Sequence, residues 1–218
     1  MKRSEINAFI RKAAAFLHEQ QFHLPPFAWW TPQDWAQRGP ECAEIVERQL
    51  GWDITDFGSG DFEKIGLFLF TLRNGETYAE KIMIADPGQV TPTHFHHHKM
   101  EDIINRGGGD LAIRLWNALP DDELADTPVN VSIDGIRRTV PAGGVVTLIP
   151  GESICLPQRL YHTFWGEHAP VLIGEVSLVN DDHTDNRFYA PVGRFPQIEE
   201  DEEPLHLLTQ DYARYFHA

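Results

Sequence analysis

Residues 64 to 180 are a series of short apolar runs that turn residues separate at close intervals. The first two runs, within KIGLFLFTLRNGETYAEKIMIA, are joined by Asn74 and Gly75, a dipeptide typical of β-hairpins. Two further turn signals, Asp134-Gly135 and Pro150-Gly151, stand where later strands would reverse. Many short strands at this spacing predict a sandwich or a small barrel, and they argue against a parallel α/β sheet.

The two ends of the chain carry helical patterns instead. Apolar side chains between residues 4 and 20 recur at spacings of three, four and seven, which predicts an amphipathic helix. A second helix is predicted over 40–49, and LLTQDYARYF predicts a short C-terminal helix after the acidic run IEEDEEP, which is expected to be a solvated linker. We therefore expect a single domain with an N-terminal helical extension (1–63) packed on a barrel (64–180), followed by a C-terminal loop and helix (181–218).

Charge and cysteine content restrict the class of protein. The 218 residues contain 18 Lys and Arg against 33 Asp and Glu, a net charge of −15, which disfavours nucleic acids and anionic membranes as partners. Cys42 and Cys155 form no C-x-x-C pair, so neither a disulfide framework nor a thiolate zinc cluster is supported. The N-terminal segment is charged, and no apolar run approaches the ~20 residues of a membrane span. We expect a cytoplasmic protein.

The stretch THFHHHKMED, residues 93–102, places four histidines within five positions and a glutamate shortly after them. Because alternate residues of a strand leave the same face, His94 and His96 are expected to converge on one point. Glu101 follows after a short turn and would bring a carboxylate oxygen to the same point. His97 is expected on the opposite face of the strand, and His98 in the turn.

Two imidazoles and a carboxylate suit a divalent transition metal, and manganese, iron, cobalt, nickel and zinc are all chemically admissible. A solvated polar loop is the alternative for this cluster. The best candidate for a fourth donor is His162, which begins another apolar strand in PQRLYHTFWG. Its alternative is a core histidine that is hydrogen-bonded to a backbone carbonyl, and the residues alone leave both interpretations open.

Two longer patterns resemble the cupins. Residues 88–108 have the spacing of the first cupin motif in full: glycine, five residues, histidine, one, histidine, four, glutamate, six, glycine. Residues 151–166 have the spacing of the second motif, except that Arg159 stands at its second glycine and Gly166 at its asparagine. The resemblance implies an all-β cupin fold, a double-stranded β-helix or jelly-roll barrel, with the predicted helices at its ends. The implied metal ligands are His94, His96, Glu101 and His162.

The fuller phrase THFHHHKMEDIINRGGGDLAIRLWNA closely resembles the D-lyxose isomerases, which are cupin sugar isomerases of about this length with helical N-terminal additions. The resemblance implies a manganese-dependent aldose–ketose isomerase, an intramolecular oxidoreductase that interconverts D-lyxose and D-xylulose and often D-mannose and D-fructose. Four protein ligands would leave about two positions on an octahedral ion for O1 and O2 of an open-chain aldose. A base would then move the C2 proton to C1 through a metal-stabilised enediol, and a hydride shift between these carbons is the alternative.

The acid and base groups are less constrained than the ligands. Lys99, in the turn before Glu101, could bind a sugar oxygen or carry a proton, unless it points to solvent. Glu175, a carboxylate in the apolar run VLIGEVSLV, would be the base if it faces inward, and the alternation equally permits a solvent-facing carboxylate. In the polar stretch NDDHTDNRF, Asp182 and Arg187 are candidates to bind sugar hydroxyls, with a solvated loop as the alternative. We expect catalytic roles for Lys99, Glu101 and Glu175, and substrate contacts from Lys99, Glu175, Asp182 and Arg187.

Two other functions use the same residue types. An iron-dependent cupin dioxygenase would have an indistinguishable ligand set, and a non-catalytic sugar-binding cupin would bind without turnover. The chain has no helix-turn-helix region and no basic patch, which weakens a regulatory role on nucleic acid. Since cupins commonly pair through sheet edges, we expect a homodimer that acts on a small sugar.

Overall fold

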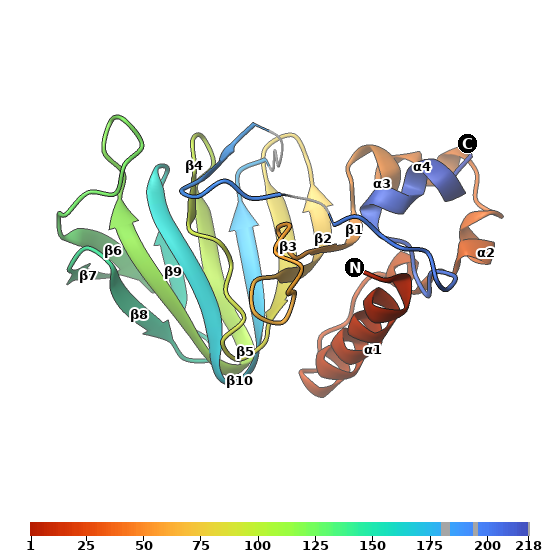
Figure 1. Cartoon of the computed structure of the whole chain (residues 1–218), viewed down its shortest axis with the longest axis horizontal. Coiled ribbons are helices and arrows are strands. Elements are labelled where there is room, and N and C mark those ends of the chain that lie inside the picture. The colour runs from red at the N-terminus through yellow and green to blue at the C-terminus, as the bar shows by residue number, and fades with distance from the viewer. Residues whose placement is uncertain (180–183, 194–195, 218) are drawn as a thin grey trace.

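The computed structural model describes residues 1–179, 184–193 and 196–217 (Figure 1). Its helices and 3₁₀ turns are α1 (Arg3–Glu19), η1 (Pro26–Trp29), α2 (Pro32–Trp35), η2 (Pro40–Cys42), α3 (Ala43–Glu47), η3 (Thr209–Asp211) and α4 (Tyr212–Tyr215). Its strands are β1 (Gly51–Thr55), β2 (Leu67–Asn74), β3 (Ala79–Ala85), β4 (His94–His96), β5 (Glu101–Asn117), β6 (Val129–Ile133), β7 (Ile136–Val140), β8 (Gly144–Leu148), β9 (Ser153–Leu156), β10 (Leu160–Ser177) and β11 (Asn186–Phe188). The prediction of a mostly β fold with helices at both ends is confirmed.

The described strands form one sheet of eleven strands, and every paired neighbour is antiparallel. The main path runs β1-β2-β3-β10-β5-β9-β6-β7, while β4, β8 and β11 attach to its sides. Within the described residues this path does not return from β7 to β1. The sheet therefore folds over itself without closing.

The long strands β5 and β10 create the fold's two layers because each changes partners halfway. The first half of β5 pairs with β9 and its second half with β8, while β10 pairs first with β4 and then with β3. The bend comes where the β5–β10 register shifts, between Glu167 and Val171. Gly108 lies there with φ +88°, and a Cβ on it would lie 2.1 Å from the carbonyl oxygen of Pro170. The final glycine of the first motif is thus required by a close approach of two backbones.

Two separate apolar cores stabilise the layers, and β2 contributes to both. Leu69 faces the interior between the layers, where Ile103, Ile113 and Phe164 are also buried. Phe68 and Phe70 face the opposite way, into the core under α1. A strand that is buried on both faces explains why LFLF reads as a continuous apolar run without alternation.

The helix α1 covers the outer face of β1–β3 with the apolar residues that its periodicity predicted: Ile6, Ile10, Ala13 and Leu17. Figure 1 shows α1 and the C-terminal α4 at the same end of the molecule, whereas β6 to β9 lie at the other end. The predicted helix over 40–49 is broken, because η2 gives way to the short α3. The predicted hairpin forms between β2 and β3, with a four-residue connection at 75–78. In the described part of the chain, no helix is long and apolar enough to cross a membrane.

The acidic run at 198–204 is mostly solvent-exposed, as expected, and it is also bonded to the start of α1. The guanidinium of Arg3 is completely buried and donates two hydrogen bonds to Asp211 (2.9 and 2.7 Å) and two to Glu200 (both 2.8 Å). The backbone N–H and the hydroxyl of Ser4 both donate to Asp201. These bonds satisfy donors at the N-terminus of a helix with acceptors from the other end of the chain.

Candidate metal centre

Strand β4 presents its two histidines to the interior because it is a short, regular strand between β10 and β11. His94 lies directly opposite His162 in the β4–β10 register, and their ring centroids are 4.2 Å apart. Phe95 points the other way and packs against Tyr161 (4.7 Å), and His97 follows it to that face, with its ring 4.9 Å from Phe95. The alternation predicted for the histidine run is therefore present.

Three of the predicted ligands converge in the structure. One ring nitrogen from each of His94, His96 and His162 lies within 4.8 Å of the corresponding atoms of the other two. Nδ1 of His94 is 2.8 Å from the carbonyl oxygen of Pro92, and Nδ1 of His162 is 3.0 Å from that of Leu160. A carbonyl can only accept, so both Nδ1 atoms carry a proton, and the lone pair of the neutral ring form is then on Nε2.

Nε2 of His162 and Nδ1 of His96 are buried and lack a hydrogen-bond partner among the described residues. Burial first, and the neighbouring His162 and His96 second, hold the pKa of His94 well below its usual range, so its ring is neutral. Neutral imidazoles with free, buried lone pairs are suited to bind a metal ion. The donor set therefore fits a divalent transition metal.

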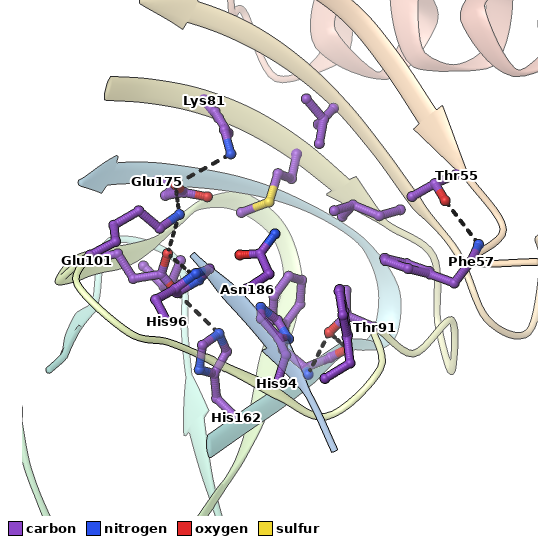
Figure 2. A pocket seen from close by; sticks show the side chains of 17 residues that line it. Thr55, Phe57, Lys81, Thr91, His94, His96, Glu101, His162, Glu175 and Asn186 are labelled. Atoms are coloured by element: carbon purple, nitrogen blue, oxygen red, sulfur yellow. Dashed lines mark hydrogen bonds and ion pairs between the residues drawn. The ribbon is translucent and has the colours of Figure 1, made fainter. Parts of the chain in front are cut away.

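Glu101, the first residue of β5, completes the cluster (Figure 2). Its Oε1 is 3.1 Å from Nε2 of His162, and its Oε2 is 3.3 Å from Nε2 of His96. Burial would raise the pKa of this carboxyl, but the charge of Lys99 and the contacts with the two histidines outweigh burial and hold the pKa well below its usual range. Glu101 is therefore an anionic donor beside the three imidazoles.

Lys99 and Glu175 are both buried, and they meet beside this cluster. Nζ of Lys99 lies 3.0 Å from Oε2 of Glu101 and donates a hydrogen bond of 2.8 Å to Oε1 of Glu175. Burial alone would lower the pKa of Lys99, but the two carboxylates outweigh it and raise the pKa above its usual value. The pKa of Glu175 is lowered, because Lys81 and Lys99 outweigh the opposing effect of burial. Both side chains are thus charged inside the cavity, and the solvent-facing alternatives for Lys99 and Glu175 are excluded.

Lys81, which the sequence patterns did not indicate as a site residue, is the direct cross-strand neighbour of Glu175. Lys81 is only 5% exposed, and its Nζ lies 3.8 Å from Oε1 of Glu175 (Figure 2). The available signal was the alternation of YAEKIMIA, which places Lys81 on the same face as Met83. Alternation alone does not show which face of the strand points to the interior.

The polar stretch NDDHTDNRF reaches the site through residues other than those predicted. Asp185 accepts hydrogen bonds from the backbone N–H groups of His98 (2.7 Å) and Lys99 (3.1 Å), and its Oδ2 lies 3.8 Å from Nδ1 of His96. It therefore holds the turn that carries Lys99 and stands behind a histidine of the cluster. The predicted Asp182 lies in 180–183, outside the described residues.

The structure does not bring Arg187 to the cavity. On β11 the neighbouring residues Asn186 and Phe188 line the cavity, so alternation turns Arg187 to the other face. Its Nε lies there 3.6 Å from Oδ2 of Asp122, and its side chain is 41% exposed. The position predicted to contact substrate is thus one residue away from the two that face the cavity.

The cluster lies in a cavity of about 570 Å³, a volume that includes the solvent at its mouth. One side carries the charged and imidazole groups, and the other is apolar. The apolar lining consists of Phe57, Leu67, Leu69, Met83, Ile103, Phe164 and Phe188.

Arg159 shows how the chain tolerates its departure from the second cupin motif. It has φ +60°, the left-handed conformation that the motif's glycine adopts without strain. Its side chain offsets the strain by donating 2.8 Å hydrogen bonds to Asp122 and to the carbonyl oxygen of Leu119, and it lies over the ring of Phe95. His162 keeps its place in the cluster despite the substitution.

The chain is also similar to known proteins. Residues 1–212 match the D-lyxose isomerase family. The chain is 51% identical to a D-lyxose/D-mannose isomerase of Serratia proteamaculans over 227 aligned positions, which cover 99% of each chain. It is 47% identical to a D-lyxose/D-mannose isomerase of Escherichia coli O157:H7, over 99% of this chain and 100% of the relative.

Solved structures with the same fold are much more distant in sequence. The L-ribose isomerase of Geodermatophilus obscurus superposes with a TM-score of 0.64 at 16% identity, over 91% of this chain and 98% of its own. The Cellulomonas parahominis L-ribose isomerase with L-ribose superposes with a TM-score of 0.61 at 17% identity and the same coverage. At such identities the likeness establishes a shared cupin-like fold.

Proposed function

Because this chain belongs to the D-lyxose isomerase family, a family of sugar isomerases, we propose that it interconverts D-lyxose with D-xylulose and D-mannose with D-fructose. One observation carries the proposal. Free imidazole lone pairs, a lysine and two ionised carboxylates meet at the charged side of one cavity. An aldose–ketose isomerase needs these groups in one place: donors for a metal, a cation for developing oxygen charge and a base for a carbon-bound proton.

His94, His96, Glu101 and His162 would hold a divalent cation, which we propose to be Mn²⁺, although Co²⁺, Ni²⁺, Fe²⁺ and Zn²⁺ share these preferences. When bound, such an ion acts as a Lewis acid that polarises the sugar carbonyl and makes the proton on C2 more acidic. The protein's contribution is to keep His94 neutral and Glu101 ionised in a buried cluster with two further imidazoles. The hydrogen bonds to the backbone oxygens of Pro92 and Leu160 fix two of the rings in the tautomer that this role requires.

Glu175 is the base in this proposal. Its carboxylate takes the proton from C2 and returns it to C1 through an enediol, while a second proton moves from O2 to O1. The ammonium of Lys99 stabilises negative charge on the sugar oxygen as it develops. A hydride shift would leave Glu175 with no proton to move, so the two routes differ in whether deuterium from D₂O enters the product at C1.

The experiment is to remove metal with a chelator, add single divalent metals, and measure ketose formation from D-lyxose and D-mannose without oxygen. Anaerobic turnover restored by Mn²⁺ supports the isomerase and excludes an iron-dependent dioxygenase. Sugar binding without turnover under every metal supports a non-catalytic sugar-binding cupin instead. Absence of both binding and turnover would overturn the assignment.

We also propose a homodimer that pairs through a sheet edge. Among the described strands, β7 ends the sheet path, and its Ile136 is 61% exposed. An unpaired edge with an exposed apolar residue is a natural pairing surface. Light scattering would report the mass of the assembly, and cell fractionation would test the cytoplasmic location expected from the sequence.

A further inference from the structure

Glu175 is held asymmetrically, with its contacts gathered on one oxygen. The ammonium of Lys99 donates to Oε1 at 2.8 Å, the hydroxyl of Ser177 donates to Oε1 at 3.1 Å, and Nζ of Lys81 lies 3.8 Å from Oε1. Oε2 receives none of these three contacts. A carboxylate fixed through one oxygen presents the other in a defined direction, and Figure 2 shows this group at the charged side of the cavity.

Of the two lysines, Lys99 is divided between two carboxylates. Its Nζ is 3.0 Å from Oε2 of Glu101 and 2.8 Å from Oε1 of Glu175. If Lys99 turns toward a sugar oxygen, as the proposed function requires, its contact with Glu175 weakens. A buried carboxylate that loses its counter-charge is costly, so a second cation must remain in place.

Lys81 has the position that this requirement demands. It stands directly across the β3–β10 ladder from Glu175 and is 5% exposed. It lies on β3, whereas Lys99 lies in the turn before β5. Its backbone is fixed on both sides, by Glu175 on β10 and by Thr71 on β2. Its position therefore does not depend on the direction in which the Lys99 side chain points.

We propose that Lys81 is a positioning residue that holds Oε1 of Glu175 while Lys99 engages the substrate, so that Oε2 faces the carbon-bound proton. This inference rests on the proposed function, because it assigns Lys81 a role through the proposed base. The competing role is direct contact with the sugar, and loss of that contact would raise KM. Loss of a positioning residue instead lowers kcat, because proton transfer becomes slower.

The test compares Lys81→Met, which keeps the aliphatic stem, with Lys81→Arg, which keeps the charge. We expect Lys81→Met to lower kcat for D-lyxose by about ten- to a hundredfold, the cost of misplacing a reacting group by about 1 Å, with KM changed less than about twofold. Bound metal per chain should equal that of the wild type, and Lys81→Arg should recover most of kcat. A normal kcat in Lys81→Met, or a raised KM with normal kcat, would overturn the inference.

A double-mutant cycle with Glu175→Gln separates the inference from the proposed function. In metal-free protein, Lys81→Met should lower the unfolding temperature more in the wild-type background than in Glu175→Gln, because only the wild-type background keeps the carboxylate charge that Lys81 faces. Equal effects in both backgrounds would refute the pairing whether or not the protein turns over sugar. Failure of the wild type to convert any sugar would refute the proposed function and leave the cycle to decide on Lys81. If Lys81→Met does not fold, the Lys81→Met/Glu175→Gln double variant and Lys81→Arg supply the comparison.

Discussion

Nε2 of His162 lies 3.1 Å from Oε1 of Glu101. Nδ1 of His162 donates to the carbonyl oxygen of Leu160, so Nε2 is the ring nitrogen that faces this carboxylate, whose pKa is well below its usual range. A cation between a ring nitrogen and an ionised carboxylate at this distance is attracted to both. The β4–β10 pairing holds His162 opposite His94, and the β5–β9 pairing holds Glu101 opposite Leu156, so both groups are fixed in the arrangement of a ligand set for a cation.

The first prediction concerns His162. His162→Gln should lower metal affinity by at least about a hundredfold and abolish isomerisation, because the ligand nitrogen is lost while the volume is kept. Metal content after dialysis, measured by mass spectrometry, and ketose formation give the result. His97→Gln is the matched control, since its ring packs against Phe95 on the other face of β4, and it should retain metal and activity. Full metal content in His162→Gln would remove this residue from the ligand set.

A second prediction separates metal binding from proton transfer. Glu175→Gln removes the proposed base without touching an imidazole, so kcat should fall by about 10²- to 10⁴-fold while bound metal stays constant. In the wild type, turnover in D₂O should place deuterium at C2 of D-lyxose formed from D-xylulose, or at C1 of the ketose in the forward direction. Nuclear magnetic resonance of the product shows this directly. A product free of deuterium, with activity kept in Glu175→Gln, would indicate a hydride shift.

The bend of the long strands yields a third prediction. Gly108→Ala adds a Cβ that would lie 2.1 Å from the backbone oxygen of Pro170, at a residue with φ +88°. Strain and overpacking together should lower the free energy of unfolding by about 2–5 kcal/mol, as measured by urea denaturation. Gly75→Ala is the control, because its nearest contact would be 3.5 Å away, and it should change stability by less than about 0.5 kcal/mol. Similar values for both variants would mean that the corner relaxes.

Local patterns predicted what depends on local geometry. The convergence of His94 and His96 follows from strand alternation over three residues, and the apolar stripe of α1 follows from its helical period. The turn at Asp134-Gly135 likewise joins β6 to β7 as the dipeptide indicates. The all-β fold class could therefore be stated from the sequence.

Features that depend on strand register could not be predicted in this way. Lys81 lies next to Glu175 only because β3 pairs with β10, and these two strands are far apart in the chain. Asn186 faces the cavity instead of Arg187 because of where the short strand β11 pairs with β4, and a shift of one residue would exchange them. The hydrogen bonds between Arg3 of α1 and Glu200 of the acidic run could not be predicted either, because the two residues are 197 positions apart in the chain. Closure of the sheet likewise depends on pairings that no single segment encodes.

The fourth prediction tests how Arg3 joins the two ends of the chain. Arg3→Met removes a fully buried guanidinium and leaves the 8% exposed Asp211 side chain without its cation, which should cost about 3–5 kcal/mol of stability. Lys12→Met is the control, because the Lys12–Asp86 pair lies at the surface, with Lys12 58% exposed, and should cost less than about 1 kcal/mol. Urea denaturation at pH 7 gives both values. Equal losses would show that burial of the pair has no consequence.

The same contact predicts an acid dependence. The hydrogen bonds from Arg3 hold the pKa of Glu200 below its ordinary value of 4.5, so the folded state favours the ionised form more than the unfolded state does. This contribution is fully present above pH 4.5 and is lost as the pH falls through the lower, folded-state pKa. The Arg3→Met variant lacks the main cause of the shift, so its stability should decline less steeply with acid, and the gap to the wild type should narrow below pH 4.5. Urea midpoints measured from pH 7 to pH 3 test this, and a gap that stays constant or widens would show that Glu200 does not contribute through Arg3.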